Sequence, residues 1–99
     1  MILKKHFNEG RLILAICDSD LIDKTFEDNT GFLNLKSGFY KGEEFSNEEI
    51  VDLLNKAYII NVVGKEAVAL LIKEKIINDK QAKQIEKVPY IQVVFDEKK

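Results

Sequence analysis

Acidic side chains crowd residues 17–31 of this 99-residue chain, a segment that also holds the single cysteine. Three of them have the close spacing seen in loops that bind Ca²⁺ or Mg²⁺: Asp18, Asp20 and Asp23. An EF-hand loop starting at Asp18 would need an acidic or amide residue, a glycine and a glutamate at three later positions, which hold Ile22, Asp23 and Asn29 here. We therefore predict no metal, and a loop of solvated carboxylates that caps a short helical turn around Leu21 and Ile22.

Cys17, Asp18 and Lys24 are the residues that a small enzyme of this sequence would use. A cysteine nucleophile needs a nearby base, and the only histidine is His6. If residues 8–10 form a hairpin loop, His6 faces about Leu12, and Cys17 lies roughly five strand residues away, about 17 Å. The adjacent Asp18 also disfavours the thiolate. The main prediction is a buried, inert thiol and no catalytic residue.

Three lysines fall on one face of a helix predicted after residue 78: Lys80, Lys83 and Lys87. This stripe could contact phosphate, but a solvated helix face is the commoner role of such lysines. Because Arg11 is the only arginine, the chain has little capacity for bidentate recognition of bases or phosphates. Phe39 and Tyr40 are explained by packing in a turn over residues 39–42, or by an apolar contact with a partner protein.

The N-terminal third has the alternation expected of β-strands. Residues 2–7 and 11–17 flank a loop whose Gly10 can adopt the left-handed backbone conformation, which predicts a β-hairpin. Both faces of residues 11–17 are apolar, which places this strand inside a sheet. Residues 32–35 predict a short third strand.

Helices are expected in the middle of the chain. Ser46 and Glu49 have the spacing of a capping box, so a helix is predicted to begin at Ser46. A second helix should include residues 65–75. The β-branched residues in 58–63 favour a strand, whereas Asn61 could cap a helix, and we expect a link that enters the second helix.

The C-terminal part predicts a short helix and then a strand. Asn78 and Gln81 repeat the capping pattern, and the helix must end before Pro89. Residues 90–95 alternate as a strand that returns to the sheet, and residues 96–99 are expected to form a solvated terminus. Strands at both ends with two to three helices between them indicate an α+β fold, formed by residues 1–99 as a single domain.

Composition limits the possible partners and the location. The chain is 45% apolar and 32% charged with a net charge of -2, so it has no overall field that attracts nucleic acid or an anionic membrane. Its longest apolar run, residues 58–63, is far shorter than the roughly 20 residues that span a bilayer. The lone cysteine and the absence of a secretion signal in residues 1–7 predict a cytoplasmic protein with no membrane partner.

Several short segments, in this order, resemble a family of small archaeal proteins catalogued as domain of unknown function 424. The segments are Cys17-Asp18 before Leu21, Lys24-Thr25-Phe26, Phe39-Tyr40-Lys41-Gly42, Asn61-Val62-Val63-Gly64 before Ala67-Val68, and Val88-Pro89 before Gln92-Val93-Val94. The resemblance covers nearly the whole chain, although the family tends to have glycine at the position of Asp23 and histidine at that of Tyr90. It implies an archaeal, cytosolic origin and assigns no reaction, cofactor or ligand.

The sequence therefore favours a non-enzymatic binding module of the cytoplasm over an enzyme. Its partner would be a protein or a ribonucleoprotein such as the translation machinery, with no cofactor. A sequence-independent RNA binder that uses the lysine stripe, and a small enzyme that uses Cys17, Asp18 and Lys24, are the two alternatives. The candidate binding residues are Asp18, Lys24, Phe39, Tyr40, Lys80, Lys83 and Lys87.

Overall fold

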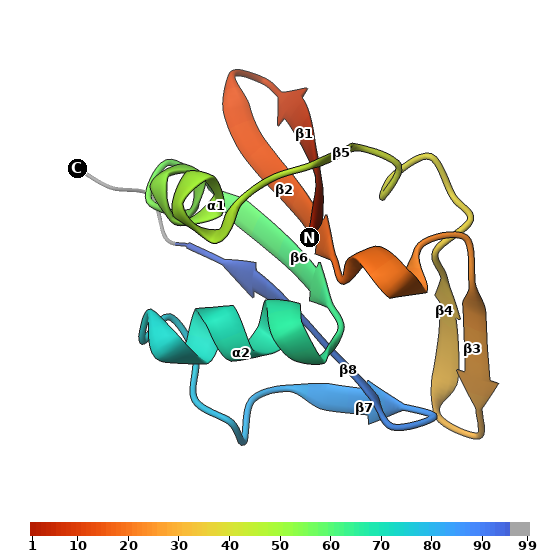
Figure 1. The fold of residues 1–99 in the computed structure, drawn as a ribbon. Helices are drawn as coiled ribbons and strands as arrows, with labels where there is room; N and C mark the ends of the chain where they lie inside the picture. Colours follow the sequence, from red (N-terminus) through yellow and green to blue (C-terminus); the bar gives the residue numbers. More distant parts are fainter. Residues whose placement is uncertain (96–99) are drawn as a thin grey trace.

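A six-stranded mixed sheet, a two-stranded sheet and two α-helices make up residues 1–95, the part of the chain that the computed structural model describes (Figure 1). The predicted solvated terminus lies outside the described residues. The large sheet has the order β5-β1-β2-β6-β8-β7, with β1 Ile2–Asn8, β2 Arg11–Cys17, β5 Glu43–Glu44, β6 Ile59–Val63, β7 Lys83–Ile85 and β8 Val88–Val94. The other elements are η1 Ser19–Leu21, β3 Thr25–Asp28, β4 Gly31–Asn34, α1 Asn47–Leu54 and α2 Lys65–Lys73. The α+β prediction is confirmed.

The N-terminal hairpin forms with a shorter loop than predicted. Glu9 and Gly10 both have positive φ, 55° and 79°, which is the geometry of a tight two-residue turn between twisted strands. Asn8 therefore pairs with Arg11, and His6 faces Ile13 rather than Leu12. β2 lies between β1 and β6, as its two apolar faces predicted, and it pairs with β6 in parallel.

The predicted link over residues 58–63 is wrong, because residues 59–63 form the central strand β6. This strand pairs in parallel with β2 and antiparallel with β8. Its β-branched side chains suit a pleated surface, and Asn61 accepts a hydrogen bond from the Gln92 amide of β8 at 2.8 Å instead of capping a helix.

The predicted third helix is also wrong. Asn78 and Gln81 do form the contacts of a helix start, since the Asn78 amide donates to Gln81 Oε1 at 2.8 Å. The chain then turns into β7, which pairs with β8 through a tight turn at Glu86 and Lys87, with φ of 51° and 68°. Ile85 is buried in β7, and an isolated short helix with a thin apolar stripe is only marginally stable.

The capping box at Ser46 is confirmed. The Ser46 hydroxyl accepts from the Glu49 amide at 3.2 Å, and the Glu49 carboxylate accepts from the Ser46 amide at 2.8 Å. Ile50 and Leu54 are the buried residues of α1, and α2 ends at Lys73, two residues before the predicted end.

The two faces of the large sheet are covered differently. Both helices pack on one face, where they meet Leu14, Ile16 and Ile60 in the larger apolar cluster (Figure 1). Cys17 and Val63 belong to a second cluster that includes Leu33 and Leu35 of the β3–β4 region. The predicted third strand therefore exists, but it pairs with β3 in a separate small sheet. No helix within residues 1–95 is long and apolar enough to cross a membrane.

Candidate functional site

Asp18 is a buried helix cap, not a solvated loop carboxylate. Its two oxygens accept from the amides of Glu66 at 3.0 Å and Ala67 at 2.8 Å, in the first turn of α2. Only 6% of the residue is exposed. The prediction that a carboxylate of this acidic loop caps the short turn around Leu21 and Ile22 is wrong, because η1 receives no side-chain cap. The carboxylate instead satisfies two unpaired amides of a helix far along the sequence, at the positive end of its dipole.

Gly64 makes room for this cap. Its φ of 115° is a conformation that other residues rarely adopt, and a Cβ added there would overlap the Asp18 carboxylate. The Gly64 amide donates to the Pro89 carbonyl at 2.8 Å, and the Asp18 amide donates to the Val63 carbonyl at 3.1 Å. Several segments that carry the family resemblance thus meet at one end of the sheet, where they hold α2 in place.

The Cys17 thiol and the Tyr40 hydroxyl both have raised pKa values. Burial, followed by the charges of Asp18 and Asp20, raises the pKa of the Cys17 thiol to about 12. Burial is also the main reason that the pKa of the Tyr40 hydroxyl rises to about 12. Both groups stay protonated at neutral pH. The prediction that the Cys17 thiol is buried is confirmed, and its inertness stays a prediction.

Lys24 is exposed and contributes its backbone to the turn before β3. Its amide donates to the Leu21 carbonyl at 3.1 Å, and its carbonyl accepts from the Leu35 amide at 2.9 Å. Because the oxygens of Asp18 are engaged by α2, the described contacts do not assemble Cys17, Asp18 and Lys24 into a reactive group. Within residues 1–95, no three His, Cys, Asp or Glu side chains are grouped so that they could hold a metal ion.

Phe39 and Tyr40 have different surroundings. Phe39 stacks on His6 with ring centroids 4.4 Å apart, and the His6 Nε2 donates to the Phe39 carbonyl at 2.9 Å. Tyr40 packs into the second apolar cluster with its ring edge-on to Phe39. Phe39 therefore fixes the loop before β5 against β1.

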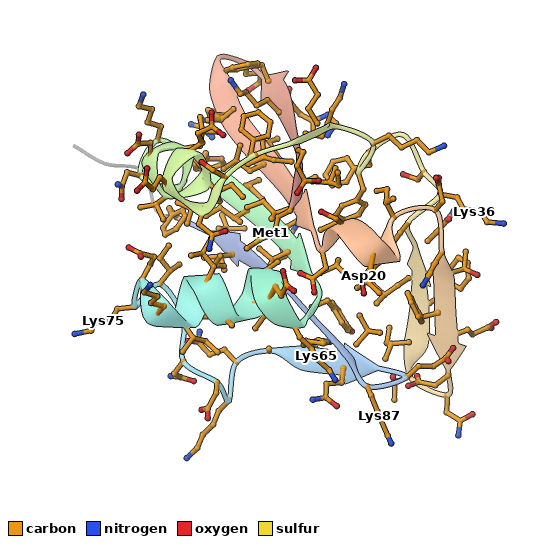
Figure 2. The ribbon with its side chains drawn as sticks, viewed as in Figure 1. Met1, Asp20, Lys36, Lys65, Lys75 and Lys87 are labelled. Carbon is orange, nitrogen blue, oxygen red and sulfur yellow. The ribbon has the colours of Figure 1, made fainter. Side chains whose placement is uncertain are left out.

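The predicted lysine stripe does not exist as a helix face. Lys80 lies in the turn after α2, Lys83 in β7 and Lys87 in the β7–β8 turn. Figure 2 shows Lys87 pointing into solvent at that turn, far from Lys75 at the end of α2. The side chains thus leave separate short elements, and the geometric basis for a phosphate-binding stripe is lost.

A groove of about 710 Å³ lies at the opposite end of the sheet, between the tip of the β1–β2 hairpin and the end of α1. Its apolar lining is Leu12, Leu53, Leu54, Ala57, Ile76 and Phe95, with the rings of Phe7 and Tyr58 beside them. Tyr58 fixes the base of the groove, because its amide donates to the Leu12 carbonyl at 2.8 Å and its carbonyl accepts from the Phe95 amide at 2.9 Å.

Three cationic residues are part of the lining of this groove. Lys5, Arg11 and Lys56 line the groove, and no carboxylate is among its described lining residues. The Arg11 guanidinium lies 4.4 Å from the centre of the Tyr58 ring, within the range of a cation–π interaction. Phe7 is 70% exposed, the largest exposure among the exposed large apolar residues of the described chain. The groove can therefore hold a ligand that is both apolar and anionic.

The sequence contained one sign of this groove. Lys5 and Phe7 alternate with the buried Leu3, which puts all three on the helix side of the sheet. Nothing local indicates that Lys56 and Tyr58, some fifty residues later, face the same space. Only the pairing of β6 with β2 brings them to the hairpin.

Comparison with known proteins gives a family and a fold. The sequence model of the family described as "Protein of unknown function (DUF424)" matches residues 6–95. The crystal structure of an uncharacterized conserved protein from Methanopyrus kandleri superposes with a TM-score of 0.77 at 20% sequence identity, and the match covers 93% of this chain and 88% of that one. This likeness shows a shared fold. No curated protein matches the sequence.

Proposed function

This chain belongs to the DUF424 family of proteins of unknown function, and we propose that it is a cytoplasmic binding module that holds an apolar, acidic segment of a partner protein in the groove beside the β1–β2 hairpin. The observation that carries the proposal is an apolar lining bordered by the cationic side chains of Lys5 and Lys56. The partner segment can belong to a free protein or to the protein part of a ribonucleoprotein.

The apolar character of the groove favours a protein segment. Aliphatic and aromatic side chains form most of its lining, so binding would remove apolar surface from water, a favourable term that a nucleic-acid backbone cannot provide. Phosphate binding relies on many cations and on bidentate arginines, and Arg11 is the only arginine of the chain. Glutamates and aspartates next to apolar residues would complement both parts of the groove.

A peptide titration tests this function. Two short synthetic peptides contain glutamate and leucine in equal number, one in alternating order and one at helical spacing. A third peptide has lysine in place of every glutamate. We expect at least one acidic peptide to shift the amide NMR signals of groove residues, and the lysine peptide to have no effect, because like charges repel across the groove.

Charge reversal supplies a matched control. The double variant Lys5→Glu/Lys56→Glu reverses two charges that line the groove. The double variant Lys80→Glu/Lys87→Glu makes the same change in net charge at exposed sites outside it. The groove variant should weaken binding of the acidic peptide by at least about tenfold, and the control by less than about twofold. Equal weakening by both variants would show that only overall charge matters and would contradict the proposal.

A titration with RNA distinguishes a protein partner from a nucleic-acid partner. An oligouridine strand is titrated under the same conditions at two salt concentrations. The proposal is overturned if this strand, and neither acidic peptide, shifts the groove residues with an affinity that falls as salt rises.

A further inference from the structure

The outer edge of β1 is only partly covered. β5 pairs with β1 at two positions, Ile2 with Glu44 and Leu3 with Glu43, whereas β1 continues to Asn8. The loop before β5 contacts this continuation through Phe39, which meets the side chain of His6. Figure 1 shows the β1–β2 hairpin projecting past the short β5 segment. An uncovered strand edge presents a row of backbone donors and acceptors to which another strand can add.

Strand geometry identifies which groups face outward. The Met1 carbonyl accepts from the Phe45 amide at 2.9 Å, on the side of β5. Backbone groups alternate in direction along a strand, so the amides and carbonyls of Lys5 and Phe7 point to this same side, away from β2. On this outward side, within residues 1–95, β5 pairs with Ile2 and Leu3 and does not reach Lys5 or Phe7.

We propose that the bound segment adds to β1 as an extra strand, with hydrogen bonds to the backbone of Lys5 and Phe7, and that this segment is acidic. The inference rests on the proposed function and specifies how the groove is used. Lys5 and Phe7 line the groove as well as the open edge, so every second side chain of an added strand would enter the apolar lining.

Charge selects the occupant of the edge. Lys4 and Lys5 are both exposed, one on each face of the strand, and an acidic strand would place opposite charge beside them. A second copy of this chain would bring the same two lysines to the shared edge, which is how natural sheets discourage edge-to-edge pairing. An acidic strand of a different protein therefore fits better than a self-dimer.

Amide hydrogen exchange tests the inference without a mutation. In the free protein the amides of Lys5 and Phe7 should exchange rapidly, while those of His6 and Asn8, which point to β2, are protected. The alternating glutamate–leucine peptide should slow exchange at Lys5 and Phe7 by at least about tenfold. Protection that appears without peptide and increases with protein concentration would identify a second copy of the chain at this edge and overturn the proposal.

A proline substitution isolates the backbone contribution. Lys5→Pro and Lys5→Gln both remove the charge, but only proline removes the outward amide, and proline is tolerated at an edge position that faces solvent. Thermal unfolding first checks that both variants remain folded. Binding of the alternating peptide should then be about tenfold weaker for Lys5→Pro than for Lys5→Gln. If Lys5→Pro does not fold, the exchange experiment on the unmodified protein decides.

The two proposals fail in different ways. If the acidic peptides bind in the groove but Lys5 and Phe7 stay unprotected, or if the helical peptide binds better than the alternating one, the added strand is refuted and the binding groove stands. If neither acidic peptide shifts groove residues, both proposals are refuted.

Discussion

Asp18 shows how a single residue can connect distant parts of this chain. It ends β2 in sequence, but its carboxylate completes the first turn of α2 nearly fifty residues later. Gly64 lies directly beneath that carboxylate, and a residue with a Cβ atom would overlap it. The pair therefore links the parallel strands β2 and β6 to the helix that follows them.

Removing this cap should destabilise the fold. Asp18→Ala leaves two amides of α2 without their acceptor, at an expected cost of about 3 kcal/mol in the free energy of unfolding, while Asp18→Asn keeps one acceptor oxygen and should cost less. Urea unfolding measures both. As a control, Asp20→Ala removes an exposed carboxylate of the same loop and should change stability by less than about 0.5 kcal/mol. Equal stability of Asp18→Ala and Asp20→Ala would refute the cap.

The buried thiol makes stability depend on pH in the alkaline range. The pKa of Cys17 is about 12 in the folded protein against 9.0 for an unperturbed thiol, so above pH 9 the unfolded chain releases a proton that the folded chain keeps. The contribution of Cys17 is complete below pH 9 and is lost as the pH rises toward 12, at about 1.4 kcal/mol per pH unit. Cys17→Ala should remove this part of the slope. Urea unfolding at several pH values from 8 to about 11 measures the free energy of unfolding of the unmodified protein and of Cys17→Ala. If the two proteins lose stability with pH at the same rate, the prediction is wrong.

At the scale of elements, two similar sequence signals had different outcomes. Ser46 with Glu49 starts α1, whereas Asn78 with Gln81 starts a single turn that becomes β7. The first signal precedes a strong apolar stripe that packs on the sheet. The second precedes a segment with one large buried residue, Ile85. This side chain is fully buried in the strand β7, so a helix would gain no further apolar burial.

The capping box of α1 should have a measurable effect. Ser46→Ala removes the acceptor for the Glu49 amide and should lower the free energy of unfolding by about 1 kcal/mol. Asp52→Ala, at an exposed position of the same helix, is the control and should have an effect below about 0.5 kcal/mol. Urea unfolding compares the two variants. If Ser46→Ala is no less stable than the control, the box contributes nothing to the folded state.

The two sheets of the molecule are stabilised by apolar clusters of unequal size. The large sheet packs against both helices, while the β3–β4 sheet is held by the smaller cluster around Leu35 and by hydrogen bonds to the β7–β8 turn. In those bonds the Glu86 amide donates to Asp28 Oδ2 at 3.1 Å, and the Glu27 amide donates to Glu86 Oε2 at 2.6 Å. Exposed contacts of this kind add little stability.

Native-state hydrogen exchange should therefore separate the two parts. We expect amides of β3 and β4 to exchange through local opening, with a free energy several kcal/mol below that of amides in the central strands β2 and β6. Exchange rates at low denaturant concentrations measure both sets. Equal protection of the two sets would mean that the small sheet opens only when the whole protein unfolds.

The sequence by itself determined the features that depend on neighbouring residues. Gly10 predicted the hairpin turn, the two apolar faces of residues 11–17 predicted an interior strand, and Ser46 predicted the start of α1. Local periodicity and capping are sufficient in these cases, because the interactions involved span only a few residues.

Tertiary structure decided what depends on pairing between distant segments. β6 became a strand because β2 and β8 satisfy its backbone on both sides, and β7 became a strand because it can pair with β8. Asp18 acquired a helix cap, and Lys5 gained Lys56 as a neighbour in the groove, through the same pairings. A backbone group inside a sheet must find a hydrogen-bond partner, and the position of that partner cannot be read from the local sequence.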